Sequence, residues 1–142
     1  LITLLDESYN ANPSSMRAAL QVAGTLPVGA GGRRIAILGD MLELGDLGPK
    51  LHTELVDAVE KGGIDLVFAS GPLMKNLFDA LPKTHRGGYA ADSTALEPAV
   101  LEALRGGDVV TVKGSNGSRM TRIVTALKAR YPEASGGAGD LK

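Results

Sequence analysis

Residues 2–13 read ITLLDESYNANP, an apolar run followed directly by a polar stretch that ends in proline. The apolar segment Ile2 to Leu5 predicts a buried strand, and the polar stretch predicts a ligand-facing loop. Asn12 is a good N-cap and Pro13 suits the first turn of a helix, so the loop must end where a helix begins. Free backbone N–H groups at such a helix start favour an anionic ligand.

Three further apolar runs, Ile35 to Leu38, Leu66 to Ala69 and Val109 to Val112, are short and show no polar alternation. This pattern is typical of strands that are buried on both faces. Segments with helical periodicity lie between them. Alternating β and α units with right-handed crossovers predict an α/β, Rossmann-like fold, with a mostly parallel sheet of about five or six strands and helices on both faces. Helices are expected around Met16 to Ala23, Lys50 to Lys61, Pro72 to Ala80, Leu96 to Leu104 and Met120 to Leu127, and a further strand at His85 to Ala90.

The composition fits one domain. The chain has 142 residues, 44 % of them hydrophobic, and a net charge of −1, so it can bury most of the apolar surface that its unfolded form exposes. Scattered Lys and Arg argue against nucleic acid as a partner. The absence of cysteine excludes a disulfide framework or a thiolate metal site. No apolar stretch approaches the roughly 20 residues of a membrane span, so we expect a cytoplasmic protein without membrane insertion.

The two ends of the sequence differ from its middle. Leu1 to Leu5 begins inside a predicted strand without an initiator Met, so the sequence looks cut from a longer protein. Residues 133–142 lack periodicity and are rich in small residues, which predicts a disordered tail. We therefore expect one domain over residues 1–132.

Polar residues follow three of the predicted strands, at the end of a parallel sheet where ligands bind. The first such segment, Asp6 to Asn12, offers carboxylates, two carboxamides and the aromatic ring of Tyr9. Its alternative interpretation is a capped turn in which Asn10 and Asn12 serve only the backbone. A cap needs one such residue and this loop has several, which favours a ligand-facing role.

The other two segments are residues 39–45, GDMLELG, and residues 113–119, KGSNGSR. Asp40 is placed where a ligand-contacting carboxylate is expected, but it could equally cap backbone N–H groups of a turn. Lys113 with two hydroxyls and glycines before a helix suits a carboxylate or phosphate, and the alternative is a structural turn with an exposed lysine. The third segment is not a Walker A loop, because no Gly-Lys pair occurs in the chain.

The sequence shows no catalytic machine of its own. His52 falls on the apolar face of the Lys50 to Lys61 segment, which predicts a satisfied, partly buried histidine. No Ser, His and acid combination has the spacing of a nucleophilic triad. No His or Cys stands close in sequence to Asp40 or Glu43, so no metal ligand is predicted either.

Three separated blocks, DESYNANPSSMRAA, RRIAILGDMLELG and VVTVKGSNGSRM, resemble the C-terminal domain of the MurF group of the Mur ligase family. They occur in the expected order and together cover much of the chain. Two positions depart from the pattern: Glu7 stands where relatives more often have Asp, and Asn116 where they often have a basic residue. We assign Asn116 no charge-dependent role.

Mur ligases have a domain for the UDP-linked substrate, a central ATPase domain and a Rossmann-like C-terminal domain that closes over the active site. The resemblance covers only the third. It implies a reaction in which ATP phosphorylates the terminal carboxylate of UDP-MurNAc-tripeptide and the amine of D-Ala-D-Ala attacks the acyl phosphate. ATP and Mg²⁺ would be bound mainly by the central domain, so this chain alone is expected to be inactive, with no catalytic residue of its own.

The resemblance also implies partners and site residues. The partners are D-Ala-D-Ala, UDP-MurNAc-tripeptide, ATP and the other Mur ligase domains. One rival interpretation is the same domain of another Mur-type ligase, which the SYNANP string disfavours. The others are a free-standing Rossmann-like module that binds a nucleotide or amino acid without catalysis, and a pure interaction domain. The residues expected to face nucleotide and substrate are Asp6, Tyr9, Asn10 and Asn12. Those expected near the dipeptide are Asp40, Ser115 and Lys113. The positive charge of Lys113 would offset the dipeptide carboxylate.

Overall fold

The computed structural model describes residues 2–132 and 135–136. Strands and helices alternate along almost the whole described part, as the apolar patterns predicted. The strands are β1 (Thr3–Glu7), β2 (Arg34–Gly39), β3 (Leu66–Ser70), β4 (Arg86–Ala90), β5 (Val109–Lys113) and β6 (Ser135–Gly136). The α-helices are α1 (Pro13–Thr25), α2 (Gly48–Thr53), α3 (Val56–Lys61), α4 (Met74–Ala80), α5 (Ser93–Ala103) and α6 (Thr121–Arg130). Three short 3₁₀ helices are η1 (Gly45–Leu47), η2 (Lys83–His85) and η3 (Asn116–Ser118).

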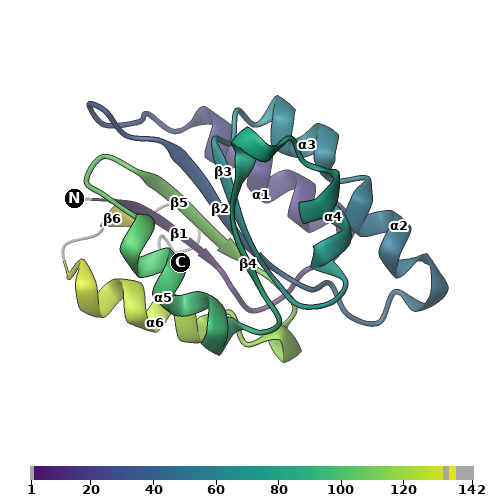
Figure 1. Cartoon of the computed structure of the whole chain (residues 1–142). Helices are drawn as coiled ribbons and strands as arrows, with labels where there is room; N and C mark the ends of the chain where they lie inside the picture. Colours follow the sequence, from purple (N-terminus) through teal and green to yellow (C-terminus); the bar gives the residue numbers. More distant parts are fainter. Residues whose placement is uncertain (1, 133–134, 137–142) are drawn as a thin grey trace.

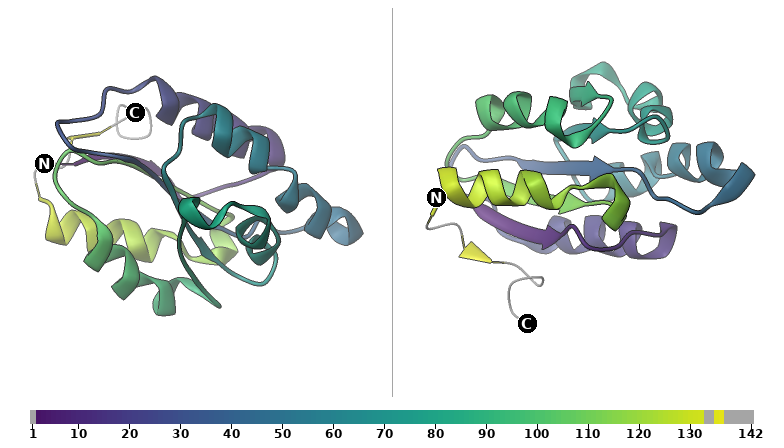
Figure 2. Two further views of the ribbon diagram at one scale, coloured as in Figure 1. Left: turned by 45° about the horizontal axis from the view of Figure 1, so that its top comes forward. Right: turned by 90° about the horizontal axis from the view of Figure 1, so that it is seen from below.

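The six strands form one sheet in the order β4-β3-β2-β5-β1-β6, and every neighbouring pair is parallel. Helices α1 to α4 cover one face of this sheet and α5 and α6 cover the other (Figure 1, Figure 2). The predicted Rossmann-like α/β fold is therefore confirmed.

The core has two apolar layers, one on each face of the sheet. In β2, Ala36 and Leu38 pack toward α1 to α4, whereas Ile35 and Ile37 pack toward α5 and α6. All five residues of β5 are buried. A central parallel strand needs apolar residues at nearly every position because both of its faces are covered, which explains the nearly continuous apolar runs.

The order of the strands places a ligand crevice. After β1, β2 and β3 the chain crosses the face that carries α1 to α4, and after β4 and β5 it crosses the opposite face. Strand β5 lies between β2 and β1, so loops leaving neighbouring strands diverge to opposite faces there. Such a switch point leaves a crevice beyond the carboxyl ends of the strands.

The helix predicted over Lys50 to Lys61 is in fact two helices, α2 and α3. The Leu55 N–H bonds to His52 O at 3.1 Å, three residues back, so the backbone tightens at this turn. This tighter turn buries both His52 and Leu55, each 0 % exposed. The additional strand predicted at His85 to Ala90 is present as β4.

The tail predicted over residues 133–142 lies mostly outside the described residues. Its described part, Ser135–Gly136, forms β6 and pairs with Thr3 and Leu4 of β1. Within the described residues, no helix is long and apolar enough to cross a membrane.

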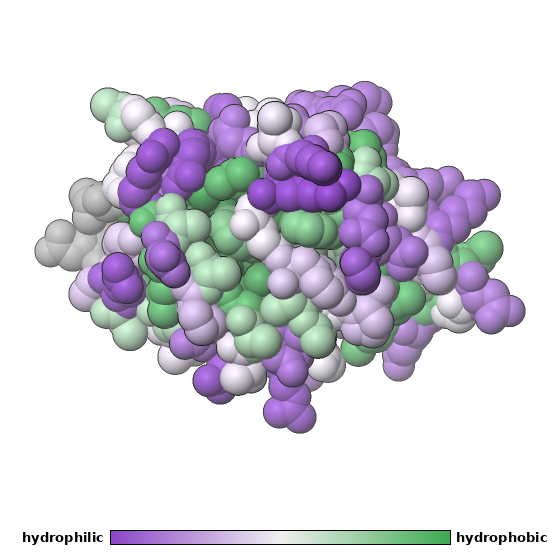
Figure 3. All heavy atoms as spheres, viewed as in Figure 1, coloured by the Kyte–Doolittle hydropathy of each residue, from purple (hydrophilic) through white to green (hydrophobic). Residues whose placement is uncertain are grey.

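The face that carries α5 and β4 has a mixed surface. Figure 3 shows neutral and weakly hydrophobic residues over the middle of this face, with hydrophilic residues around them. Ala95 and Ala99 on α5 are exposed there. Small apolar side chains at a surface are ordinary and mark no particular site.

Candidate functional site

The three polar segments that follow β1, β2 and β5 meet at the carboxyl edge of the sheet, and Ser115 joins them. Its backbone N–H donates to Asp40 O at 3.1 Å. Its hydroxyl accepts the Leu42 N–H at 2.9 Å and donates to Ala11 O at 3.3 Å. One residue of the third segment thus holds the first and the second in fixed relation.

Asp6 shapes the turn that leaves β1. Its Oδ1 accepts the Ser8 N–H at 3.1 Å and the Ser8 hydroxyl at 2.6 Å, and the side chain is largely buried. The Ser8 Oγ also lies 3.1 Å from Thr121 Oγ1 at the start of α6. The carboxylate is therefore engaged within the protein and fixes the start of the first segment.

The other residues of the first segment divide into two kinds. The Asn12 Oδ1 accepts the Ser15 N–H at 2.8 Å, and the Ser15 Oγ accepts the Asn12 N–H at 3.0 Å, so the two form a capping box for α1. Tyr9 is 64 % exposed and Asn10 is also exposed. Asn12 is exposed as well, but its side chain serves the backbone of α1.

Lys113 ends β5 as a buried cation. Its side chain is 5 % exposed, its Nζ donates to Asn10 O at 2.9 Å, and it lies 3.8 Å from Glu7 Oε1. The alternative of an exposed lysine in a plain turn is wrong. Lys113 instead ties the end of β5 to the middle of the first segment.

Asp40 caps the start of α4. Its Oδ1 accepts the Met74 N–H at 2.7 Å and its Oδ2 accepts the Leu73 N–H at 3.2 Å, with the residue 5 % exposed. Gly71 packs against the carboxylate with φ +103°, so a side chain at this position would be strained and would meet Asp40. The capping role, which the sequence left as one of two readings, is present in the structure.

A crevice of about 360 Å³ opens beside Asp40 at the carboxyl ends of β2, β3 and β4. Ser70 and Ser93 line it and are only 2 % and 3 % exposed. Arg119 stands at its surface, with φ 58°, and supplies a positive charge. Arg119 belongs to the third predicted segment, although no role was predicted for it. Ser70 and Ser93 were not predicted, because a single Ser after a strand forms no recognisable pattern.

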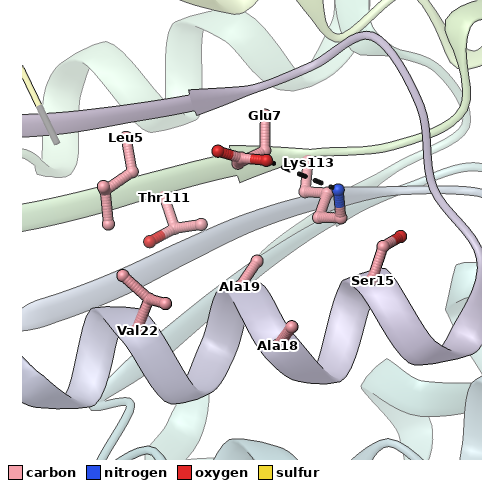
Figure 4. A pocket seen from close by; sticks show the side chains of 8 residues that line it. All are labelled: Leu5, Glu7, Ser15, Ala18, Ala19, Val22, Thr111 and Lys113. Atoms are coloured by element: carbon pink, nitrogen blue, oxygen red, sulfur yellow. Dashed lines mark ion pairs between the residues drawn. The ribbon is translucent and has the colours of Figure 1, made fainter. Parts of the chain in front are cut away.

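Lys113 lines a different hollow, of about 190 Å³, between α1 and the strand pair β1 and β5 (Figure 4). Of the three residues predicted near a dipeptide, the structure thus places Asp40 on the crevice and Lys113 on this separate hollow. Ser115 lines neither of the two and connects the loops around them.

His52 fixes the loop that follows β2. Its Nε2 accepts the Met41 N–H at 3.0 Å, so the ring is neutral there and its Nδ1–H donates to Gly48 O at 2.7 Å. The prediction of a satisfied histidine is confirmed, and the ring is fully buried. Within the described residues no three His, Cys, Asp or Glu side chains converge on one point.

Tyr89 reports on the charge of Asp40. Its hydroxyl donates to Gly71 O at 2.9 Å; burial raises the pKa of the phenol, and the negative charge of Asp40 raises it further. The folded state therefore prefers the neutral phenol. Its stabilising contribution is present below pH 10.0, the pKa of an unperturbed tyrosine, and is lost as the pH rises through the higher pKa of the folded protein.

We expect Asp40→Asn to lower the pKa of Tyr89, measured by an NMR titration of ring-labelled tyrosine. The Asp79→Asn variant is the control, because Asp79 raises this pKa less than Asp40 does. An equal response to both variants would show that Asp40 has no particular influence on Tyr89.

The fold and the convergent loops define a Rossmann-like α/β domain that carries its candidate ligand site at the carboxyl edge of a parallel sheet. Residues 2–116 match the family model described as Mur ligase, glutamate ligase domain. The chain belongs to this family.

Two curated relatives carry the name UDP-N-acetylmuramoyl-tripeptide--D-alanyl-D-alanine ligase. The chain is 37 % identical over 127 residues to that of Escherichia coli (strain K12), which covers 88 % of this chain and 26 % of the relative. It is 33 % identical over 129 residues to that of Bacillus subtilis (strain 168), with 89 % and 28 % covered. The chain thus spans roughly a quarter of the length of these relatives.

Solved structures of similar shape include crystal structure II of MurF from Acinetobacter baumannii, with TM-score 0.71, 26 % identity, and coverage of 86 % of this chain and 27 % of that one. The MurF ligase from Thermotoga maritima, solved in complex with ADP, has TM-score 0.71 at 22 % identity, with 89 % and 28 % covered. The second likeness shows the fold alone.

Proposed function

We propose that this chain is the C-terminal domain of an ATP-dependent ligase that joins D-Ala-D-Ala to UDP-MurNAc-tripeptide. The observation that carries the proposal is the meeting of three loops, joined by Ser115, at the switch point of the sheet. The names of the relatives support the choice of substrates. The nucleotide-linked substrate and the use of ATP favour a cytoplasmic location.

In the proposed reaction, ATP transfers its terminal phosphoryl group to the tripeptide carboxylate and leaves as ADP. The amine of D-Ala-D-Ala then attacks the acyl phosphate carbon, and phosphate departs as the amide bond forms. ATP and Mg²⁺ are held mainly by a central domain outside this chain. This chain contributes positioning, which supplies about 7–11 kcal/mol in well-oriented systems, and closure that excludes water.

The roles of the residues follow the hydrogen bonds that their side chains make within the protein. Tyr9 and Asn10 are exposed and face nucleotide and substrate, while Asp6 and Asn12 hold the loop that presents them. The engagement of both latter side chains within the protein supports a positioning role rather than a direct contact.

The dipeptide occupies the crevice beside Asp40, which residues from the loops after β2, β3, β4 and β5 line. Arg119 is exposed at the crevice and is the better-placed partner for its carboxylate, because Lys113 lines the separate hollow and not the crevice. Lys113 contributes a deeper positive charge and holds the first loop.

Exposed apolar side chains at this edge support closure against another domain. Tyr9, Leu42 and Leu47 are 64 %, 39 % and 60 % exposed and lie in the loops after β1 and β2. Tyr9 and Leu47 are exposed by more than half, so a second domain that closes over these loops would remove apolar surface from water.

An amide-resolved NMR titration with D-Ala-D-Ala, L-Ala-L-Ala and ADP tests the proposal. D-Ala-D-Ala, but not L-Ala-L-Ala, is expected to shift the amides of Asn10, Asn12 and residues 113–118. The amide of Gly63, on a distant turn before β3, serves as the control. No shift with any of the three ligands, in the full-length protein as well as in this chain, would refute the proposal.

A further inference from the structure

The hollow between α1 and the sheet is separate from the crevice, and the two share no lining residue. Figure 4 shows two facing walls. The strand wall consists of Leu5 and Glu7 from β1 with Thr111 and Lys113 from β5, and the helix wall of Ser15, Ala18, Ala19 and Val22 from α1.

The strand wall contains a buried hydroxyl without a partner. Thr111 is 0 % exposed, and its Oγ1 is the single buried side-chain N or O atom, within residues 2–132 and 135–136, that makes no hydrogen bond. Folded proteins pair nearly all such atoms, because a buried unpaired polar group is unfavourable. A bound molecule with a polar group at this point would pair it.

The same wall carries both signs of charge. Glu7 pairs with Lys113 in the β-sheet register, and Leu5 pairs with Thr111 two residues earlier. The Glu7 Oε1 to Lys113 Nζ distance of 3.8 Å is within ion-pair range but longer than a charge-assisted hydrogen bond. A carboxylate, an ammonium and a hydroxyl thus lie side by side along one side of the hollow.

The helix wall is apolar over most of its length. Ala18, Ala19 and Val22 present methyl groups to the hollow, and the two alanines leave the space between helix and sheet unfilled. The Ser15 hydroxyl at its end is already used in the cap of α1. This wall therefore suits an aliphatic group.

We propose that this hollow binds a zwitterionic α-amino acid with a small aliphatic side chain. Its ammonium faces the Glu7 carboxylate and the Thr111 hydroxyl, and its carboxylate faces the Lys113 ammonium. Its side chain packs against the methyl groups of α1. The volume of about 190 Å³ is below the range of drug-sized ligand pockets, which fits so small a molecule.

Binding there would be felt by the candidate site. The Lys113 Nζ that faces the hollow also donates to Asn10 O at 2.9 Å. A ligand carboxylate that binds this ammonium would weaken the hydrogen bond from Lys113 to the loop that presents Tyr9 and Asn10. The amino acid is therefore an effector of the proposed ligase, coupled to the loop by one shared cation.

Methyl NMR of the full-length protein, labelled at Ala, Val, Leu and Thr methyl groups, tests this site. The probes are L-alanine, D-alanine, L-valine and, as a separate arm, D-Ala-D-Ala. We expect saturable shifts of the Ala18, Ala19 and Thr111 methyl groups with at least one free amino acid, with Kd near the order of 1 mM. Ala95 and Ala99 on α5, on the other face of the sheet, are the internal controls.

Two variants make the test specific. Thr111→Val keeps the shape and removes only the unpaired hydroxyl, so it is expected to weaken amino-acid binding about tenfold without lowering the melting temperature. Ala19→Leu fills the hollow and is expected to abolish the shifts. Thr94→Val, which changes a hydroxyl at the crevice, is the matched control and is expected to leave amino-acid binding unchanged.

The absence of saturable shifts with every free amino acid overturns the proposal, and so does equal binding by Thr111→Val and the unchanged protein. If D-Ala-D-Ala alone moves these methyl groups, the hollow belongs to the dipeptide site and the effector proposal fails while the proposed ligase function stands. If the full-length protein binds a free amino acid in the hollow but does not ligate D-Ala-D-Ala, the amino-acid site stands and the proposed ligase function fails.

Discussion

Replacing Lys113 by alanine in the proposed full-length ligase is expected to lower kcat/KM for D-Ala-D-Ala by about 100-fold, the effect of a reacting group displaced by about 1 Å. The Lys113 ammonium lies 2.9 Å from Asn10 O and 3.8 Å from Glu7 Oε1, with the side chain 5 % exposed. Its removal leaves a carbonyl and a carboxylate without their partner, so the first loop must rearrange.

Steady-state kinetics with varied D-Ala-D-Ala measure this effect. Lys61→Ala is the matched control, because Lys61 is 81 % exposed on α3, and its kinetics are expected to be unchanged. Asn10→Ala isolates the exposed side chain from the carbonyl that Lys113 binds. Unaltered kinetics for Lys113→Ala would remove this residue from the site.

Replacing His52 by leucine is expected to lower the free energy of unfolding by about 3 kcal/mol, because it leaves two hydrogen-bonding groups of the backbone unsatisfied. The imidazole is 0 % exposed and accepts from Met41 N while donating to Gly48 O. Leucine has a similar volume but satisfies neither group. Buried groups without partners account for most of the expected loss.

Urea denaturation followed by circular dichroism gives this free energy. His85→Leu is the control, because His85 is part-exposed in η2 and the only hydrogen bond of its ring within the described residues, to Asp65 O, is 3.2 Å long. It is expected to change stability by about 0.5 kcal/mol or less. A loss of the same size in both variants would contradict the role assigned to His52.

The central strands were predictable because burial on both faces constrains the residue type at nearly every position. Ile35 to Leu38 is apolar throughout, and Val109 to Val112 is apolar apart from Thr111. Only a strand covered on both faces requires such a pattern. The break between α2 and α3 was not predictable, because apolar periodicity runs through it. The tighter turn depends on the burial of His52 and Leu55, which only the packed structure decides.

The site was predictable as a place but not in the direction of its side chains. The rule that ligands bind beyond parallel strands located three segments, and the structure brings them together. Whether Asp40 faces a ligand or caps α4 depends on where β3 delivers the start of α4, which no local pattern records. Ser70 and Ser93 join the crevice only through the order of the strands.

The partners of β1 have a consequence for the order in which the protein is assembled. Thr3 pairs with Val109 of β5 and with Ser135 of β6, whereas β2, β3 and β4 are neighbours both in the chain and in the sheet. A nascent chain is made from its N-terminus, so β2, β3 and β4 can pair before β5 and β6, the partners of β1, have been synthesised. The loop that carries Tyr9 and Asn10 is fixed only after Lys113 and Ser115 have left the ribosome, so an unfinished chain can hold part of the sheet without the assembled candidate site.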